Sequence, residues 1–169
     1  AEIVLEGVNV NETRTGLLDI LAAMGASIEL MEQRQSGGEP VADILVRSSA
    51  LRSTTVSGGL VPRAIDELPL VALLGCFAEG ETIVRDAQEL RAKESDRVEA
   101  VVDVLTRMGA PITAHPDGFA VHGPVSLRGA RVDGRGDHRI GMLGAIAGNL
   151  ATGETRIEND AVGVSYPDF

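Results

Sequence analysis

Internal repetition is the feature that most restricts how this chain can fold. The segment LLDILAAMGA, which begins at Leu17, recurs as VVDVLTRMGA from Val101, 84 residues later. The segment LLGCFAEGETIVRD is matched by AIAGNLATGETRIEND, so that Gly-Glu-Thr occurs at Gly80 and again at Gly153, 73 residues later. Repeats of this kind are supersecondary units that bury their apolar faces against one another. We therefore expect a unit made of a buried helix, a strand, an amphipathic helix and short strands. The chain is expected to begin within one unit, to end within another, and to be a segment of a longer polypeptide.

The apolar periodicity predicts alternating strands and helices, and hence an α/β fold. Residues 66–78 are apolar nearly all round, which is typical of a buried helix. Residues 95–108 carry apolar side chains at helical spacing, with Ser95 as the expected N-cap. Two further helices are predicted, over residues 12–24 and 138–151. Strands are predicted over residues 2–8, 27–35, 42–48, 81–85, 111–114, 118–122, 130–133 and 154–158.

Composition limits the possible partners of the chain. A length of 169 residues suits a single domain spanning residues 1–169, and aromatic residues make up only 2%, so the core must be aliphatic. The formal net charge of −10 argues against nucleic acid or an anionic membrane as the partner. The single cysteine, Cys76, lies in the apolar run LVALLGCFA and is expected to be buried in the core.

Targeting and metal-binding signals are missing from the sequence. No apolar run reaches the ~20 residues that span a membrane, and the chain does not start with a basic and then apolar leader. No cysteine and histidine spacing predicts a metal site. We therefore expect a cytoplasmic protein without a membrane partner.

Two charged clusters stand directly before apolar helices. KESDR, at residues 93–97, precedes one helix, and Asp137-His138-Arg139 precedes another. Helix starts carry partial positive charge, so cations placed there are unfavourable unless something negative lies nearby. Two such sites suggest a shared anionic ligand, with carboxylates beside it for proton transfer. At the 73-residue offset Asp66 corresponds to Arg139, so the repeat places a third polar group at an equivalent helix start. The residues expected to face one cleft are Asp66, Lys93, Glu94, Arg97, His138 and Arg139.

Each cluster also has a purely structural interpretation. Asp66 could cap the helix that follows it, and residues 93–97 could be a solvated cap in which Arg97 pairs with Glu94 or Asp96. Asp137 could likewise be a cap followed by a surface pair. His115 and His122 lie in turn and strand segments without partners, and we expect them to be structural. The joint occurrence of three polar helix starts at related positions of a repeat favours the shared site.

Four motifs together resemble one known family. LRAKESDR, GDHRIGM, IDELPLVALLG and the terminal SYPDF are similar to the C-terminal domain of EPSP synthase, an enolpyruvyl transferase of the shikimate pathway. The resemblance implies a domain of repeated βαβαββ units with buried helices inside and sheets outside, around a pseudo-threefold axis. It implies transfer of the enolpyruvyl group of phosphoenolpyruvate to the 5-hydroxyl of shikimate 3-phosphate, in aromatic amino-acid biosynthesis. It implies no metal and no organic cofactor.

The resemblance also implies roles for the site residues. Asp66 contacts the shikimate hydroxyls and accepts a proton, and Glu94 handles the proton at the enolpyruvyl methylene carbon. Arginine suits phosphoenolpyruvate because its planar fork binds carboxylate or phosphate in bidentate fashion. Because Arg97 and Arg139 lie at helix starts, we expect the removal of either one to weaken ligand binding and to leave thermal stability nearly unchanged. The residues expected to bind substrate are Lys93, Arg97, His138 and Arg139.

Two departures from the family pattern affect the predicted site. Val164 stands where some members carry a lysine in the tail motif, so no lysine is carried over there. The N-terminal domain, which supplies further anion contacts in the family, is a partner missing from this sequence, and the chain alone is expected to be an inactive half of the enzyme. Another enolpyruvyl transferase, or a non-catalytic anion-binding homologue, remains the alternative.

Overall fold

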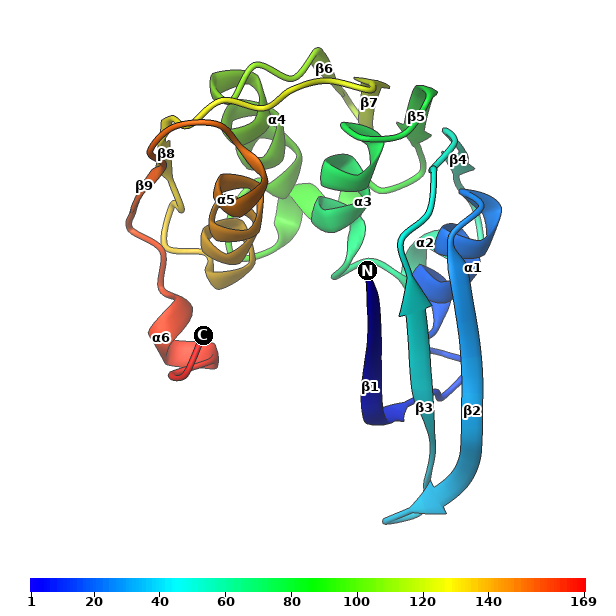
Figure 1. Ribbon diagram of the computed structural model, residues 1–169. Coiled ribbons are helices and arrows are strands. Elements are labelled where there is room, and N and C mark those ends of the chain that lie inside the picture. Colours follow the sequence, from blue (N-terminus) through cyan, green and yellow to red (C-terminus); the bar gives the residue numbers. More distant parts are fainter.

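Three separate sheets and the helices between them make up the structure. The computed structural model describes residues 1–169 and is drawn in Figure 1. Helices α3, α4 and α5, at Leu68–Gly75, Arg97–Arg107 and His138–Leu150, pack against one another. The short strands lie outside these helices (Figure 1). The predicted α/β arrangement with helices inside and sheets outside is confirmed.

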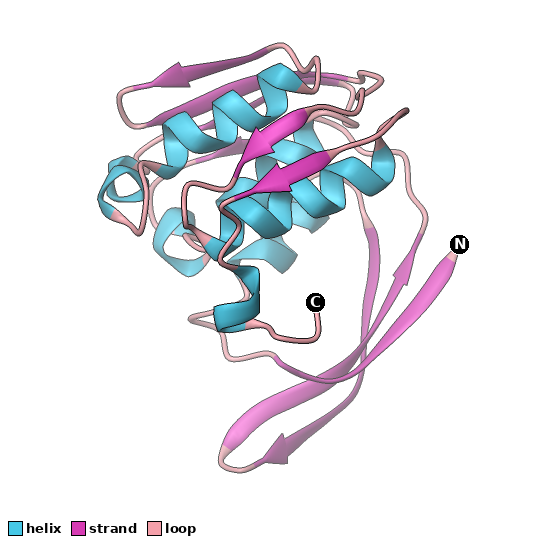
Figure 2. Ribbon diagram, turned by 90° about the vertical axis from the view of Figure 1, so that its left-hand side faces the viewer, coloured by secondary structure: helices cyan, strands magenta, loops and turns pink.

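The first sheet is a three-stranded antiparallel ribbon that projects from the helical body (Figure 2). Its order is β1-β3-β2, with β3 in the middle and antiparallel to both neighbours. Helix α1 connects β1 to β2, and a turn at Gly37 and Gly38, both with positive φ, connects β2 to β3. The bounds are β1 Glu2–Asn9, α1 Gly16–Ala23, β2 Ser27–Ser36 and β3 Glu39–Arg47.

The other two sheets lie against the body. The second has the order β4-β5-β7-β6, in which β4 runs parallel to β5 and the remaining pairs are antiparallel. The third is a parallel pair, β8 and β9. The bounds are β4 Thr55–Val56, β5 Gly80–Val84, β6 Ile112–His115, β7 Gly118–Gly123, β8 Arg131–Asp133 and β9 Arg156–Glu158.

The predicted elements all exist, with shifted ends. The first helix begins four residues later than predicted, at Gly16, because residues 12–14 form a turn and Thr15 is the N-cap residue. None of the helices combines the length and apolar character that a membrane span requires. The elements missed by the sequence pattern are β4 and three short helices, which hold too few residues to show a helical period. The short helices are α2 Leu60–Arg63, the 3-10 helix η1 Gln88–Ala92 and α6 Val162–Ser165.

The core is aliphatic, as the composition predicts. One cluster of 29 buried residues joins the helices to the sheets, and Phe119 is its only aromatic member. Cys76 is fully buried, and its thiol donates a hydrogen bond to the carbonyl oxygen of Ala72 at 3.4 Å. Burial raises the pKa of this thiol to about 12. The expectation that Cys76 is a core residue is confirmed.

A glycine and threonine pair explains part of the sequence repeat. A Cβ atom on Gly75 of α3 would lie 3.0 Å from the Cβ atom of Thr82 in β5. At the same offset, a Cβ atom on Gly148 of α5 would lie 2.9 Å from that of Thr155. Such separations leave no room for a side chain, so each helix rests directly on the chain that follows it. The two units therefore repeat a packing contact as well as a sequence.

Candidate functional site

The two predicted charged clusters meet where α4 and α5 begin. Asp137 caps α5, because its Oδ1 accepts a hydrogen bond from the Arg139 amide at 3.0 Å. At α4 the cap is Asp96, whose Oδ1 accepts from the Glu99 amide at 3.1 Å. The prediction of Ser95 as N-cap is therefore wrong. Its hydroxyl donates instead to Asp137 Oδ2 at 3.0 Å, across the gap between the two helix starts.

Arg97 and Asp137 form a buried ion pair. The Arg97 side chain is 1% exposed and that of Asp137 is 0% exposed. Nε of Arg97 donates to Asp137 Oδ2 at 2.8 Å, and Nη2 donates to Oδ1 at 3.3 Å. Burial alone would lower the pKa of the guanidinium, but the hydrogen bonds and charge of Asp137, with the charges of Glu94 and Asp66, raise it above its usual value. Both groups are therefore charged in the folded chain.

The outer end of the same guanidinium meets two more carboxylates. Nη1 of Arg97 lies 3.3 Å from Asp66 Oδ1, and Nη2 donates to Glu94 Oε2. Asp66 is 23% exposed and Glu94 is 52% exposed. The cluster is therefore open to solvent on the side of Asp66 and Glu94, whereas its opposite side, at Asp137, is buried.

Asp66 is the junction of three arginines that come from different parts of the chain. In addition to Arg97, Arg139 Nη2 lies 3.2 Å from Asp66 Oδ2, and Arg14 Nη2 lies 3.8 Å from the same oxygen. Arg139 Nη1 also donates to the backbone carbonyl oxygen of Asp66 at 3.4 Å. The N-cap position of α3 belongs to Glu67 and receives no side-chain cap bond, so the interpretation of Asp66 as a cap is wrong.

The charges of this cluster balance one another. Three arginines, Arg14, Arg97 and Arg139, face three carboxylates, those of Asp66, Glu94 and Asp137. An anion that binds here must therefore displace a carboxylate from an arginine, or bring further cations with it. No group of three or more His, Cys, Asp or Glu side chains is arranged to hold a metal ion.

Two predicted site residues form no side-chain hydrogen bond or ion pair with the cluster. The Lys93 ammonium pairs with Glu89 Oε1 at 2.9 Å. His138 is the half-buried first residue of α5, and its side chain makes no hydrogen bond. Val164, at the position of the tail-motif lysine, is 87% exposed on α6. The structure thus brings together Asp66, Glu94, Arg97 and Arg139 of the six predicted residues.

Sequence reasoning missed Arg14 and the pairing of Asp137. The repeat held a signal for Arg14, since the 84-residue offset carries it to position 98, one residue from Arg97. Asp137 belongs to the Asp137-His138-Arg139 cluster, but nothing in the neighbouring sequence shows that its partner is Arg97, 40 residues away. The expectation that Arg97 serves only to hold an anion is wrong, because its inner edge forms a buried ion pair with Asp137. This pair argues against the expectation that the loss of Arg97 leaves thermal stability nearly unchanged.

Acid is expected to weaken the fold through Asp137. Burial alone would raise the pKa of this carboxyl, but Arg97, Ser95 and the Arg139 amide lower it below its usual value. The stabilisation is therefore fully present above the unfolded pKa of about 3.9, and it is lost as the pH falls through the lower folded pKa. We expect Asp137→Asn to reduce the unfolding free energy at pH 6 and to flatten its decline below about pH 4. Urea unfolding of the chain at a series of pH values measures the unfolding free energy at pH 6 and its decline in acid. An equally steep decline in the variant would mean that other carboxylates cause it.

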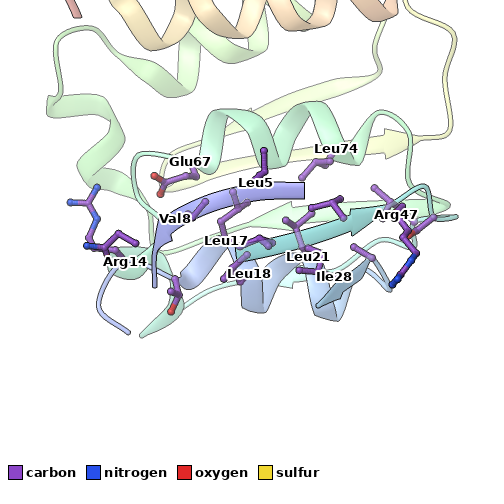
Figure 3. Close-up of a pocket in the computed structure, with 17 residues that line it drawn as sticks. Leu5, Val8, Arg14, Leu17, Leu18, Leu21, Ile28, Arg47, Glu67 and Leu74 are labelled. Carbon is purple, nitrogen blue, oxygen red and sulfur yellow. The ribbon is translucent and has the colours of Figure 1, made fainter. Parts of the chain in front are cut away.

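An apolar hollow lies beside the charged cluster. It has a volume of about 420 Å³ and lies between β1 and α1, with Leu5 and Val8 on one side and Leu17 and Leu21 on the other (Figure 3). Arg14 stands at one end of it. Because its walls are mostly aliphatic, this hollow does not suit a phosphate or carboxylate ligand.

Comparisons with known proteins agree with one another. The family model of EPSP synthase (3-phosphoshikimate 1-carboxyvinyltransferase) matches residues 1–169. A 3-phosphoshikimate 1-carboxyvinyltransferase of Roseiflexus sp. (strain RS-1) is 54% identical over all of this chain and 39% of its own length. The protein with the same description from Herpetosiphon aurantiacus is also 54% identical and is covered to 39%. The chain therefore spans about two fifths of the length of these curated relatives.

Solved structures give the same result for the fold. EPSP synthase from Acinetobacter baumannii superposes with a TM-score of 0.94 at 38% identity, over 99% of this chain and 40% of that one. The enolpyruvyl transferase NikO from Streptomyces tendae superposes with a TM-score of 0.70 over 99% of this chain and 36% of its own. At 20% identity, the second likeness shows a shared fold alone.

Proposed function

Because this chain belongs to the EPSP synthase family, we propose that it forms part of a 3-phosphoshikimate 1-carboxyvinyltransferase. Its reaction is the transfer of the enolpyruvyl group of phosphoenolpyruvate to the 5-hydroxyl of shikimate 3-phosphate, with release of phosphate, in aromatic amino-acid biosynthesis. The observation that carries the proposal is the cluster of Asp66, Glu94, Arg97 and Arg139, which unites residues from three helix starts.

The cluster contains the groups that an addition and elimination require. In the addition, Asp66 accepts the proton of the attacking hydroxyl while Glu94 donates a proton to the methylene carbon of phosphoenolpyruvate. In the elimination, that carbon returns a proton to Glu94 while Asp66 gives up its proton to the departing phosphate. The solvent-exposed side of Asp66 and Glu94 is where substrate can reach both carboxylates.

Cations are needed because negative charge develops on the leaving phosphate. In this proposal Arg97 and Arg139 hold phosphoenolpyruvate, Lys93 lies between the two substrates, and His138 supports the site. The outer Nη1 and Nη2 groups of Arg97, now held by Asp66 and Glu94, are the ones an incoming anion takes over. Lys93 reaches the cluster only by leaving Glu89, an exposed i,i+4 partner that holds it weakly.

The neutral balance of the cluster supports a half-site. Two substrates that carry phosphate groups bring more negative charge than three already paired arginines can neutralise. Further cations must come from elsewhere, and in this proposal they come from a partner domain on the rest of the enzyme. We take residues 1–169 as one part of a two-domain transferase, in keeping with their share of the relatives' length.

The apolar hollow supports an incomplete domain. The sheet orders β1-β3-β2 and β5-β7-β6 correspond, and α1 corresponds to α4 in the sequence repeat. Helix α3 covers β5 and β7, but β1 has no such helix, and Ile3 and Leu5 are 59% and 47% exposed. We infer that the hollow is filled in the longer enzyme by an apolar helix that plays the part of α3 in this unit.

Phosphate release tests the proposal. The 169-residue chain with phosphoenolpyruvate and shikimate 3-phosphate is expected to show no turnover, because an open half-site admits water and lacks part of its cations. Adding the remaining polypeptide, or assaying the full-length enzyme, is expected to produce turnover. Turnover by the chain alone near the full rate would refute the half-site. A full-length protein that binds phosphate but does not release phosphate from phosphoenolpyruvate would be a non-catalytic homologue.

A further inference from the structure

We propose that Asp137 is a positioning residue, which fixes the orientation in which Arg97 presents its N–H groups to the anionic substrate. The proposal rests on the function proposed above, since it takes that anion to be phosphoenolpyruvate. Asp137 is fully buried, so it cannot contact the substrate and acts through its partners.

The Asp137 carboxylate joins both helix starts with four hydrogen bonds. Oδ2 accepts from Ser95 Oγ at 3.0 Å and from Arg97 Nε at 2.8 Å, both next to the start of α4. Oδ1 accepts from the Arg139 amide at 3.0 Å, in α5, and from Arg97 Nη2 at 3.3 Å. A carboxylate has about four acceptor positions, so this one is saturated and has no freedom to turn.

The backbone beneath Asp137 is also held. The Asp137 amide donates to the carbonyl oxygen of Gly134 at 2.9 Å, and the Gly136 amide donates to that of Asn159 at 2.7 Å. Gly136 has a φ of +70°, and Arg135 before it has a φ of +55°, so the turn adopts a conformation that few residues tolerate. The carboxylate is therefore placed by a constrained turn rather than by a mobile loop.

This arrangement decides which part of Arg97 is available. Asp137 occupies the Nε and Nη2 edge, so the Nη1 and Nη2 end points toward Asp66 and Glu94. When a substrate anion displaces those two carboxylates, the inner edge stays bonded to Asp137 and the guanidinium keeps its orientation. Preorganised donors of this kind need no rearrangement when charge develops, which is the basis of electrostatic stabilisation.

The test uses Asp137→Asn in the full-length enzyme. An amide keeps the shape of the carboxylate but presents an N–H group to donors on one side, so Arg97 loses its bidentate partner. We expect KM for phosphoenolpyruvate to rise roughly ten- to a hundredfold, with a smaller change in KM for shikimate 3-phosphate. KM does not depend on the amount of folded enzyme, whereas a purely structural role would lower only the apparent kcat and the melting temperature.

Companion variants separate the possible outcomes. Asp137→Glu retains the charge but shifts the carboxylate, and a positioning role predicts no rescue of KM. In an Arg97→Lys background, Asp137→Asn is expected to add little, because both changes disrupt the same contact. Asp43→Asn is the matched control, since Asp43 pairs with Arg34 at 2.9 Å in the remote β1-β3-β2 sheet and should leave KM unchanged.

Ser95→Ala covers the case in which Asp137→Asn does not fold. It removes one donor to Asp137 and leaves the ion pair intact, so a rise in KM of roughly two- to tenfold is expected. Unchanged KM for phosphoenolpyruvate in Asp137→Asn, or in Ser95→Ala if the first is unfolded, overturns the positioning role. The unmodified enzyme in the same assay tests the proposed function itself, because absence of its turnover would refute that function and not the positioning role alone.

Discussion

Replacing Glu94 by glutamine in the full-length enzyme is expected to lower kcat by roughly 10²–10⁴-fold, the usual scale for lost acid–base catalysis. Glutamine has nearly the same shape but cannot donate or accept the proton at the methylene carbon. KM for phosphoenolpyruvate should stay the same or fall, because the Glu94 carboxylate that pairs with Arg97 Nη2 is removed. Steady-state phosphate release at varied phosphoenolpyruvate measures both constants.

Glu99→Gln is the control for Glu94→Gln. Glu99 lies in the first turn of α4, the helix that Glu94 precedes; it is 50% exposed and pairs with Arg91 at 3.1 Å. Its replacement should leave kcat unchanged. If kcat of Glu94→Gln also stays unchanged, Glu94 serves only as an ion-pair partner of Arg97, which is the structural interpretation that the sequence left open.

Arg97→Ala is expected to destabilise the chain by about 3–5 kcal/mol, because it leaves the Asp137 charge buried without its cation. Asp137 is 0% exposed, so water cannot solvate it unless the two helix starts separate. Urea unfolding of the chain, with the unmodified sequence alongside, gives the change in the free energy of unfolding. Replacing Arg97 and Asp137 together by apolar residues of similar size should recover much of the loss, since no charge is then left unpaired.

Arg107→Ala separates this effect from the loss of any arginine on α4. Arg107 pairs with Asp103 at 2.9 Å, but it is 54% exposed, so its removal should cost less than about 1 kcal/mol. If Arg97→Ala unfolds at the same urea concentration as Arg107→Ala, the hydrogen bonds from Ser95 and the Arg139 amide suffice to hold Asp137. The buried pair would then contribute little to stability.

Much of the fold follows from the sequence because its causes are local. The spacing of apolar residues differs between helices and strands, and this spacing predicts α3, α4 and α5 from the sequence alone. The repeat added the order of the elements in each unit, and the structure shows that the Gly75 and Thr82 contact recurs at the same 73-residue offset. Four short elements, β4, α2, η1 and α6, were missed, since they hold only two to five residues each.

The charged helix starts could also be recognised in the sequence, because a cation at a helix N-terminus is unfavourable and therefore indicates a negative partner. Sequence alone thus determined the α/β class, the repeating unit and four of the residues that the cluster contains, namely Asp66, Glu94, Arg97 and Arg139. Their neighbourhood in space was an inference from the repeat, and the salt bridges of Asp66 confirm it.

Only the tertiary structure decided which charge pairs with which. Arg97 had Glu94 and Asp96 within reach in the sequence, yet its buried partner is Asp137, while Asp96 caps the helix and binds Arg91. Charge interactions depend on distance and on exclusion of water, and both are set by how α4 and α5 pack rather than by spacing along the chain. For the same reason the sequence did not predict that Arg14 pairs with Asp66 or that Lys93 pairs with Glu89. Period is a local property of a chain, whereas the partner of a buried charge is a property of the folded interior.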